Sequence, residues 1–167
     1  MRSVYVLAAL VVVLIAIVVI SRTGGFARRA GGGTAESPHW TAEEEALLRS
    51  QFPDAIASPS GLRSIIRTPG TGDVPPRGAT ATVEYEGRLL RDGTKFDSSY
   101  DRHQPLVFQV GVGRVIAGWD EALATMQRGE RRTVIIPWWL AYGERGAPPR
   151  IPPRAALVFE IQLLDFH

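Results

Sequence analysis

The chain contains no cysteine, and only three of its 167 residues are histidines. Without cysteine there is no disulfide bond, no thiol nucleophile and no thiolate-bound metal. His39, His103 and His167 are scattered along the chain, without the short spacing that metal-ligating histidines show. The sequence therefore offers no candidate metal site.

Motifs for activated nucleophiles and for nucleotide cofactors are also missing. Ser98-Ser99 has no neighbouring histidine motif that would activate a hydroxyl. Gly111-Val112-Gly113 lacks the third glycine and the βαβ setting of a dinucleotide site. If the chain is an enzyme, it works without a metal, a cofactor or a covalent intermediate.

An excess of charge of one sign is absent too. The formal net charge is +2, and residues 61–167 carry 14 basic and 12 acidic side chains. Such a balance lacks the basic surface by which nucleic-acid-binding domains are recognised. We therefore expect no nucleic-acid partner.

A long apolar run does stand at the start of the chain. Residues 4–20 are apolar apart from Tyr5 and carry no charge. A helical run of this length is near the shortest that spans a bilayer, and no small-residue cleavage signal follows it. We expect an uncleaved transmembrane anchor over residues 1–23, with a signal peptide as the alternative. Three arginines follow the run and one precedes it, which favours a cytoplasmic C-terminal side.

Residues 24–60 are expected to form a flexible, Gly-rich linker with one short acidic helix. Thr41 and Glu44 fit a capping box at the start of this helix. The helix should run to Gln51 and end before Pro53. It is either a solvated spacer or, through its small apolar patch, a dimerisation helix.

The folded domain is expected from Gly61 to the end of the chain, residues 61–167. Alternating segments between Gly, Pro and Asp turns predict strands over 62–67, 81–90, 94–99, 106–110, 131–136 and 156–164. Apolar residues at helical spacing predict one short helix over 119–126. This pattern of five or six antiparallel strands and one helix indicates an α+β fold.

One helix cannot cover a flat sheet of this size, so we expect a twisted sheet wrapped around it. Trp119 then faces Tyr85, Phe96, Phe108 and Phe159, a set of five side chains that we call the aromatic cup. The cup is either a filled core or an apolar pocket with a floor. Periodicity does not separate these two readings.

Rotation about an X–Pro bond is a reaction that an apolar pocket without reactive groups is able to catalyse. Its barrier of about 18–20 kcal/mol comes from amide resonance. Removing water from the planar amide, and donating hydrogen bonds that favour the twisted amide, stabilises the transition state without covalent chemistry.

Between residues 61 and 166 the chain carries a series of short motifs. In order, they are 83–87, 92–99, 115–123, Met126, Gly129-Glu130, Ile136-Pro137, 140–143, 151–153 and 157–161. In this order the motifs resemble the FKBP-type peptidyl-prolyl cis-trans isomerase family. The resemblance implies the FKBP-like fold, isomerisation of X–Pro bonds with a preference for apolar residues before proline, and no cofactor.

The resemblance also implies roles for individual residues. Trp119 would be the floor under the prolyl ring, and the Ile116 N–H and the Tyr142 hydroxyl would donate to substrate carbonyls. Asp97 would orient polar groups at the mouth of the cup, or is instead a turn residue paired with Arg102 or Tyr85. The residues implied as walls and substrate contacts are Tyr85, Phe96, Leu106, Val115, Ile116, Ile151 and Phe159. The catalytic candidates are thus Tyr85, Asp97, Ile116 and Tyr142.

Three departures from the family pattern stand out. Leu106 takes a position that is often aromatic, which should widen the pocket. Trp138-Trp139 replaces a Pro-and-acid pair, and we expect at least one of these rings to be exposed, as a rim for clients or as a membrane contact. Residues 147–150 contain two prolines, which should stiffen this flap and affect both substrate range and macrolide affinity.

Taken together, the sequence predicts a membrane-anchored prolyl isomerase that assists the folding of exported proteins. Its expected partners are Pro-containing unfolded or nascent polypeptides and rapamycin-like macrolides. Anchored relatives in bacteria favour the periplasmic face of the membrane, against the charge count. The alternative is an FKBP-fold binding module or holdase chaperone that captures Pro-containing segments with little catalysis.

Overall fold

The structure is a computed structural model that describes residues 39–167. The predicted membrane anchor and the Gly-rich part of the linker lie outside the described residues. Within residues 39–167, no helix is long and apolar enough to cross a membrane.

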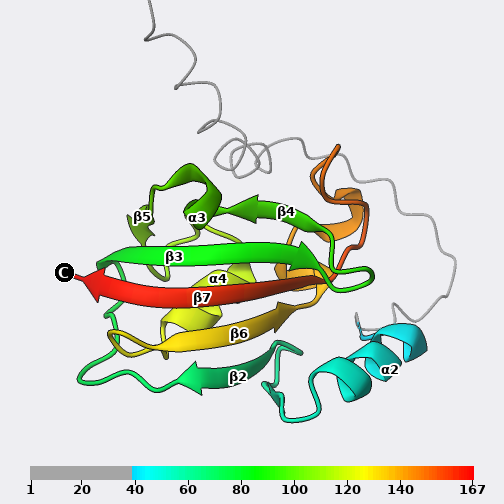
Figure 1. Cartoon of the computed structure of the whole chain (residues 1–167), viewed down its shortest axis with the longest axis horizontal. Coiled ribbons are helices and arrows are strands. Elements are labelled where there is room, and N and C mark those ends of the chain that lie inside the picture. Colours follow the sequence, from blue (N-terminus) through cyan, green and yellow to red (C-terminus); the bar gives the residue numbers. More distant parts are fainter. Residues whose placement is uncertain (1–38) are drawn as a thin grey trace, which may run out of the picture. The chain divides into compact units, whose positions relative to one another are not determined.

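One antiparallel sheet dominates the fold (Figure 1). Its strands are β1 (Ile56–Ala57), β2 (Arg63–Thr68), β3 (Thr80–Leu89), β4 (Lys95–Ser98), β5 (Leu106–Gln109), β6 (Arg131–Ile136) and β7 (Leu157–Phe166). They are ordered β1-β2-β6-β7-β3-β4, and β5 also pairs with β3. The expected α+β arrangement with an antiparallel sheet and a short central helix is confirmed, and the two-residue β1 extends it.

The helices are short and flank this sheet. They are α2 (Ala42–Gln51), α3 (Ser99–Arg102), α4 (Ala117–Leu123) and the 3₁₀ turns η2 (Trp138–Leu140) and η3 (Gly143–Arg145). Helix α4 lies against one face of the sheet, behind β6 and β7 in the view of Figure 1. It begins two residues earlier and ends three residues earlier than the predicted 119–126, yet Met126 beyond its end is fully buried.

The central strand β3 shows why the sheet has two different faces. Its residues alternate between buried and half-buried, because successive side chains point to opposite sides of a strand. Val83 and Tyr85 face α4, whereas Glu84 and Glu86 lie on the other face. The alternation read from the sequence is confirmed.

A tight approach brings α4 onto the sheet. A Cβ atom on Gly118 would lie 2.5 Å from a methyl carbon of Ile136 on β6, far inside van der Waals contact. Only glycine lets the first turn of the helix sit this close to the strand. The position of Trp119, the next residue, follows from this contact.

Helix α2 belongs to the folded domain, which differs from the expected spacer. The predicted capping box is present, since Thr41 accepts from the Glu44 N–H while Glu44 accepts from the Thr41 N–H. Leu48 is completely buried, in a second core cluster with Leu90, Ile135 and Ala156. The compact unit therefore runs from Trp40 to His167, and the expected boundary at Gly61 is too late.

Candidate active site

The aromatic cup forms as a set of rings in contact, which mostly pack edge to face, whereas Trp119 and Phe108 form a tilted pair. Trp119 lies 5.0 Å from Tyr85, 5.3 Å from Phe159 and 5.8 Å from Phe108, measured between ring centroids. Phe96 joins through Phe159 at 5.6 Å. Trp119 is only 3% exposed, which fits a floor at the base of the cup.

The loop before α4 is fixed by a carboxylate. Asp120 accepts hydrogen bonds from the Gly111 and Gly113 N–H groups, both at 2.8 Å. Both glycines have φ above +70°, where other residues are strained. The glycine motif is therefore a turn that delivers Val115 and Ile116 to the cup, as the sequence indicated.

The far end of α4 is held by a buried ion pair at the start of β6. Arg132 is 7% exposed and Glu130 is 2% exposed, and their side chains pair at 2.6 Å. Arg132 also donates to the carbonyl and the hydroxyl of Thr125, just beyond the end of α4, and to the carbonyl of Ala122, which accepts from the Thr125 N–H as well. The cup floor is thus clamped at both ends of its helix.

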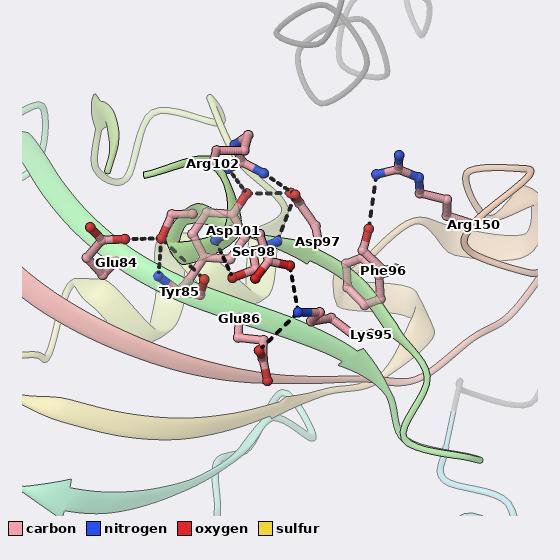
Figure 2. A network of polar contacts seen from close by, with 11 residues as sticks. Glu84, Tyr85, Glu86, Lys95, Phe96, Asp97, Ser98, Asp101, Arg102 and Arg150 are labelled. Carbon is pink, nitrogen blue, oxygen red and sulfur yellow. Dashed lines mark hydrogen bonds and ion pairs between the residues drawn. The ribbon is translucent and has the colours of Figure 1, made fainter. Parts of the chain in front are cut away.

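Polar side chains meet at one side of the cup mouth (Figure 2). The Tyr85 hydroxyl donates to Asp97, and Arg102 donates both to Asp97 and, at 2.9 Å, to the Tyr85 oxygen. The Arg102 guanidinium also lies over the Tyr85 ring, 5.5 Å from its centroid. The pairing of Asp97 with Arg102 and Tyr85, considered from the sequence, is confirmed, and it places the carboxylate beside the cup.

Backbone hydrogen bonds orient this network. The Tyr85 N–H donates to the hydroxyl of Ser99, which is fully buried and in turn donates to Glu84. Ser99 begins α3, the helical turn that carries Arg102. The short helix α3 therefore positions Arg102 over β3 and β4.

The two donors that the family resemblance implies for substrate carbonyls have no acceptor among residues 39–167. They are the backbone N–H of Ile116, which stands at the N-cap of α4, and the hydroxyl of Tyr142. Burial raises the pKa of Tyr142, and the negative charge of Asp97 raises it further. Tyr142 is therefore a neutral phenol with a free O–H at physiological pH.

The remaining predicted wall residues also gather at the cup. Leu106, Val115 and Ile116 are partly buried against its core, and Ile151 is buried within it. Ala147 and Ile151 exchange two backbone hydrogen bonds of 2.9 and 3.0 Å across the flap of residues 147–150. The structure thus brings every predicted site residue to one place.

The tryptophan pair differs from expectation, since neither ring is exposed. The segment is the 3₁₀ turn η2 rather than an extended strand, and both rings are half-buried. Trp139 donates to the Ser60 carbonyl at 2.9 Å and packs against Trp40 at 5.7 Å. Trp138 lies under Arg154, whose guanidinium is 5.4 Å from the ring centroid.

Two arginines near the cup were not among the predicted site residues. Arg102 completes the network at Asp97, and Arg150 donates to the Phe96 carbonyl at 3.2 Å (Figure 2). The sequence named Arg102 as a pairing partner of Asp97 but did not count it as a site residue; it lies five residues after Asp97, at the end of the helical turn α3. Nothing in the sequence pattern pointed to Arg150.

The described part of the chain contains no group of three or more His, Asp or Glu side chains arranged to hold a metal ion. The arrangement is instead a cluster of buried aromatic side chains with neutral and charge-assisted hydrogen-bond donors beside it. Such a site can desolvate an amide and hold its carbonyls, without transferring a proton.

Comparison with known proteins matches the chain to one family. The family model "FKBP-type peptidyl-prolyl cis-trans isomerase" matches residues 72–164, just over half of the chain. "Peptidyl-prolyl cis-trans isomerase FPR2" of Saccharomyces cerevisiae is 56% identical over 88 residues, which are 53% of this chain and 65% of the yeast protein. "FK506-binding protein 1A" of Aspergillus fumigatus is 47% identical over 108 residues, 64% of this chain and 96% of that protein.

A solved structure matches the fold as well. The crystal structure of AtFKBP13 superposes with a TM-score of 0.66 and 38% sequence identity, covering 68% of this chain and 99% of that one.

Proposed function

The chain belongs to the FKBP-type peptidyl-prolyl cis-trans isomerase family, and from this premise we propose that its aromatic cup catalyses rotation about X–Pro bonds in unfolded polypeptides. The observation that carries the proposal is the pairing of an apolar floor with two unengaged donors. Trp119 closes the cup below, and the Ile116 N–H and the Tyr142 O–H point to no acceptor among residues 39–167.

The prolyl ring is the group that this cup accommodates. A proline side chain is apolar and lacks an N–H, so it can enter the cup without leaving a buried donor unpaired. Trp119 supplies a flat floor, with Tyr85, Phe96 and Phe159 around it. The residue before proline lies toward Leu106 and Val115, whose apolar side chains favour an apolar partner.

Catalysis follows from two changes on binding: the imide loses its solvating water, and the neighbouring carbonyls gain hydrogen bonds from the protein. The planar imide is stabilised by charge separation between its oxygen and nitrogen, which water favours. In the cup this solvation is removed. The Ile116 N–H and the Tyr142 O–H hold the neighbouring carbonyls, so that binding energy is available to the twisted state. The Tyr85–Asp97–Arg102 network keeps the mouth in one geometry.

Refolding of a protein that is limited by X–Pro isomerisation tests this function. The uncatalysed slow phase lasts tens of seconds at 25 °C. The full-length chain should shorten this phase at catalytic concentrations. If it suppresses aggregation of the client but leaves the slow phase unchanged, the cup is a capture site of a holdase and the catalytic proposal is wrong.

Macrolides are proposed to occupy the same cup. The name of the Aspergillus fumigatus relative states binding of FK506. An FK506- or rapamycin-like macrolide should therefore compete with peptide substrate. Inhibition that is not competitive with a Leu-Pro peptide would place the macrolide elsewhere.

The membrane anchor and the periplasmic location remain part of the proposal. Their support is the uncharged apolar run of residues 4–20. A reporter fused after His167 that is active only outside the cytoplasm tests the location. Recovery of the full-length chain in the soluble fraction without detergent would overturn the anchor.

A further inference from the structure

Two loops border the aromatic cup, residues 110–116 and residues 141–151, and we call them the rim. The acidic side chains in and next to the rim already have partners within the fold. The Asp120 carboxylate, next to the first loop, accepts from two backbone N–H groups at 2.8 Å. Glu144 pairs with Arg154 at 2.6 Å. Across the mouth, Asp97 is paired with Arg102.

The arginines of the rim, in contrast, have no acidic partner among residues 39–167. Arg114, Arg145 and Arg150 are exposed, and none of them forms an ion pair with any residue in the described range 39–167. Two of them directly precede residues that were predicted to contact the substrate. Arg114 precedes Val115, and Arg150 precedes Ile151. The rim therefore carries cationic groups whose charge the fold does not compensate.

Arg150 is the best placed of the three. Its Nη1 donates to the backbone carbonyl of Phe96, which lies on strand β4 next to Asp97 (Figure 2). This hydrogen bond holds the guanidinium beside one of the residues of the cup. A guanidinium has five N–H donors in a planar fork that matches a carboxylate. Because one backbone carbonyl uses only one donor, the others remain for a ligand.

We propose that the rim, through Arg150, selects X–Pro sites flanked by aspartate or glutamate. The inference rests on the proposed isomerase function and specifies its substrate class. A carboxylate next to a cup-bound proline gains an ion pair with Arg150, and a basic residue is repelled there. The cup binds the proline and the apolar residue before it. The rim then favours substrates with acidic residues on either side of these two.

Three peptides of equal length test the selection: Glu-Leu-Pro-Glu, Gln-Leu-Pro-Gln and Lys-Leu-Pro-Lys, each within the same neutral flanks. With the full-length chain at low ionic strength, kcat/KM should be about two- to fivefold higher for the Glu peptide than for the Gln peptide, the range that one exposed ion pair gives. The Lys peptide should be the slowest. In about 1 M salt the differences should vanish, because charges are then screened within about 3 Å.

The variant Arg150→Gln should bring the ratio of Glu to Gln peptides close to one. The ratio is the readout, since a purely structural effect of losing the bond to Phe96 changes all peptides alike. Arg128→Gln is the matched control. It removes the same charge, but Arg128 pairs with Asp165, at the far end of β7 from the flap.

The outcomes separate the two proposals. If all three peptides are accelerated equally, the acidic preference is wrong and the isomerase function stands. If the preference survives in Arg150→Gln, the assignment to Arg150 is wrong. If a folded chain accelerates none of the peptides, the proposed function itself fails.

Discussion

At the scale of single residues, the hydroxyl of Tyr142 is the most informative atom of the site. It has no hydrogen-bond partner among the described residues, so removing it costs the fold no bond. We predict that Tyr142→Phe keeps its thermal stability while kcat/KM for a Leu-Pro peptide falls about two- to tenfold, the value of one hydrogen bond. Steady-state assays and thermal melts measure both quantities.

Tyr100→Phe is the control for this prediction. Tyr100 is 42% exposed and donates to no described residue. Its substitution should change neither quantity. Equal activity of Tyr142→Phe and the unchanged chain would remove Tyr142 from the mechanism.

The buried tyrosines also predict how stability responds to pH. Burial raises the pKa of Tyr85, and Asp97 raises it further; burial and Asp97 act in the same way on Tyr142. Above about pH 10, tyrosines of the unfolded chain lose protons while these two retain theirs in the fold. The unfolded state then binds fewer protons, so stability falls as pH rises.

Urea unfolding from about pH 8 to pH 11 measures this dependence. The free energy of unfolding should be flat up to the ordinary tyrosine pKa of about 10 and decline above it. The decline should be smaller in Tyr142→Phe. A stability that rises above pH 10 would contradict the burial of neutral phenols.

Sequence reasoning at this scale succeeded where a position had one plausible environment. Trp119, Tyr85 and Phe159 are large apolar rings on known faces of regular elements, so their meeting could be expected. Arg150 was not identified, and the Trp138-Trp139 pair was expected to be more exposed than it is, because the environment of both depends on irregular backbone. In a 3₁₀ turn, unlike a strand, two neighbouring rings do not point to opposite sides, so both can be half-buried, and periodicity does not predict such turns.

At the scale of elements, helix α4 depends on the buried pair Arg132–Glu130. Removing one partner of a buried ion pair leaves the other charge uncompensated. We predict that Arg132→Met lowers the free energy of unfolding by about 3–5 kcal/mol. Chemical denaturation measures the loss.

A double variant distinguishes this cause from simple loss of packing. Adding Glu130→Leu to Arg132→Met removes the isolated carboxylate and should recover part of the stability. If the double variant is less stable than the single one, the uncompensated charge is not the source of the loss.

Helix α2 tests whether the segment before Gly61 is structural. Leu48 is completely buried against the sheet. We predict that Leu48→Ala costs about 2–5 kcal/mol, the usual effect of truncating a buried leucine. Leu47→Ala, on the partly buried side of the same helix, should cost less.

Equal and small effects of both substitutions would return α2 to the role of a spacer. The sequence predicted the helix and its capping box, because these signals are local. It did not predict the docking of α2, because Leu48 meets Leu90, Ile135 and Ala156 only after the sheet has formed.

At the scale of the whole molecule, the fold makes the site by curling one sheet around one helix. The motif order along residues 61–166 was enough to identify the family and to assemble the cup. The uncompensated charge of the rim could not be read from the near-neutral composition. It depends on which acids the fold engages, such as Asp120 at a glycine turn and Glu144 at Arg154.

The most direct test of the account is the isomerisation rate of a Leu-Pro peptide with the full-length chain, compared with the uncatalysed rate. We predict clear acceleration, which is lost in Trp119→Leu when circular dichroism shows that variant to be folded. A folded, unchanged chain that leaves the rate at its uncatalysed value, or a Trp119→Leu variant with full activity, would contradict the claim that the aromatic cup is an isomerase site.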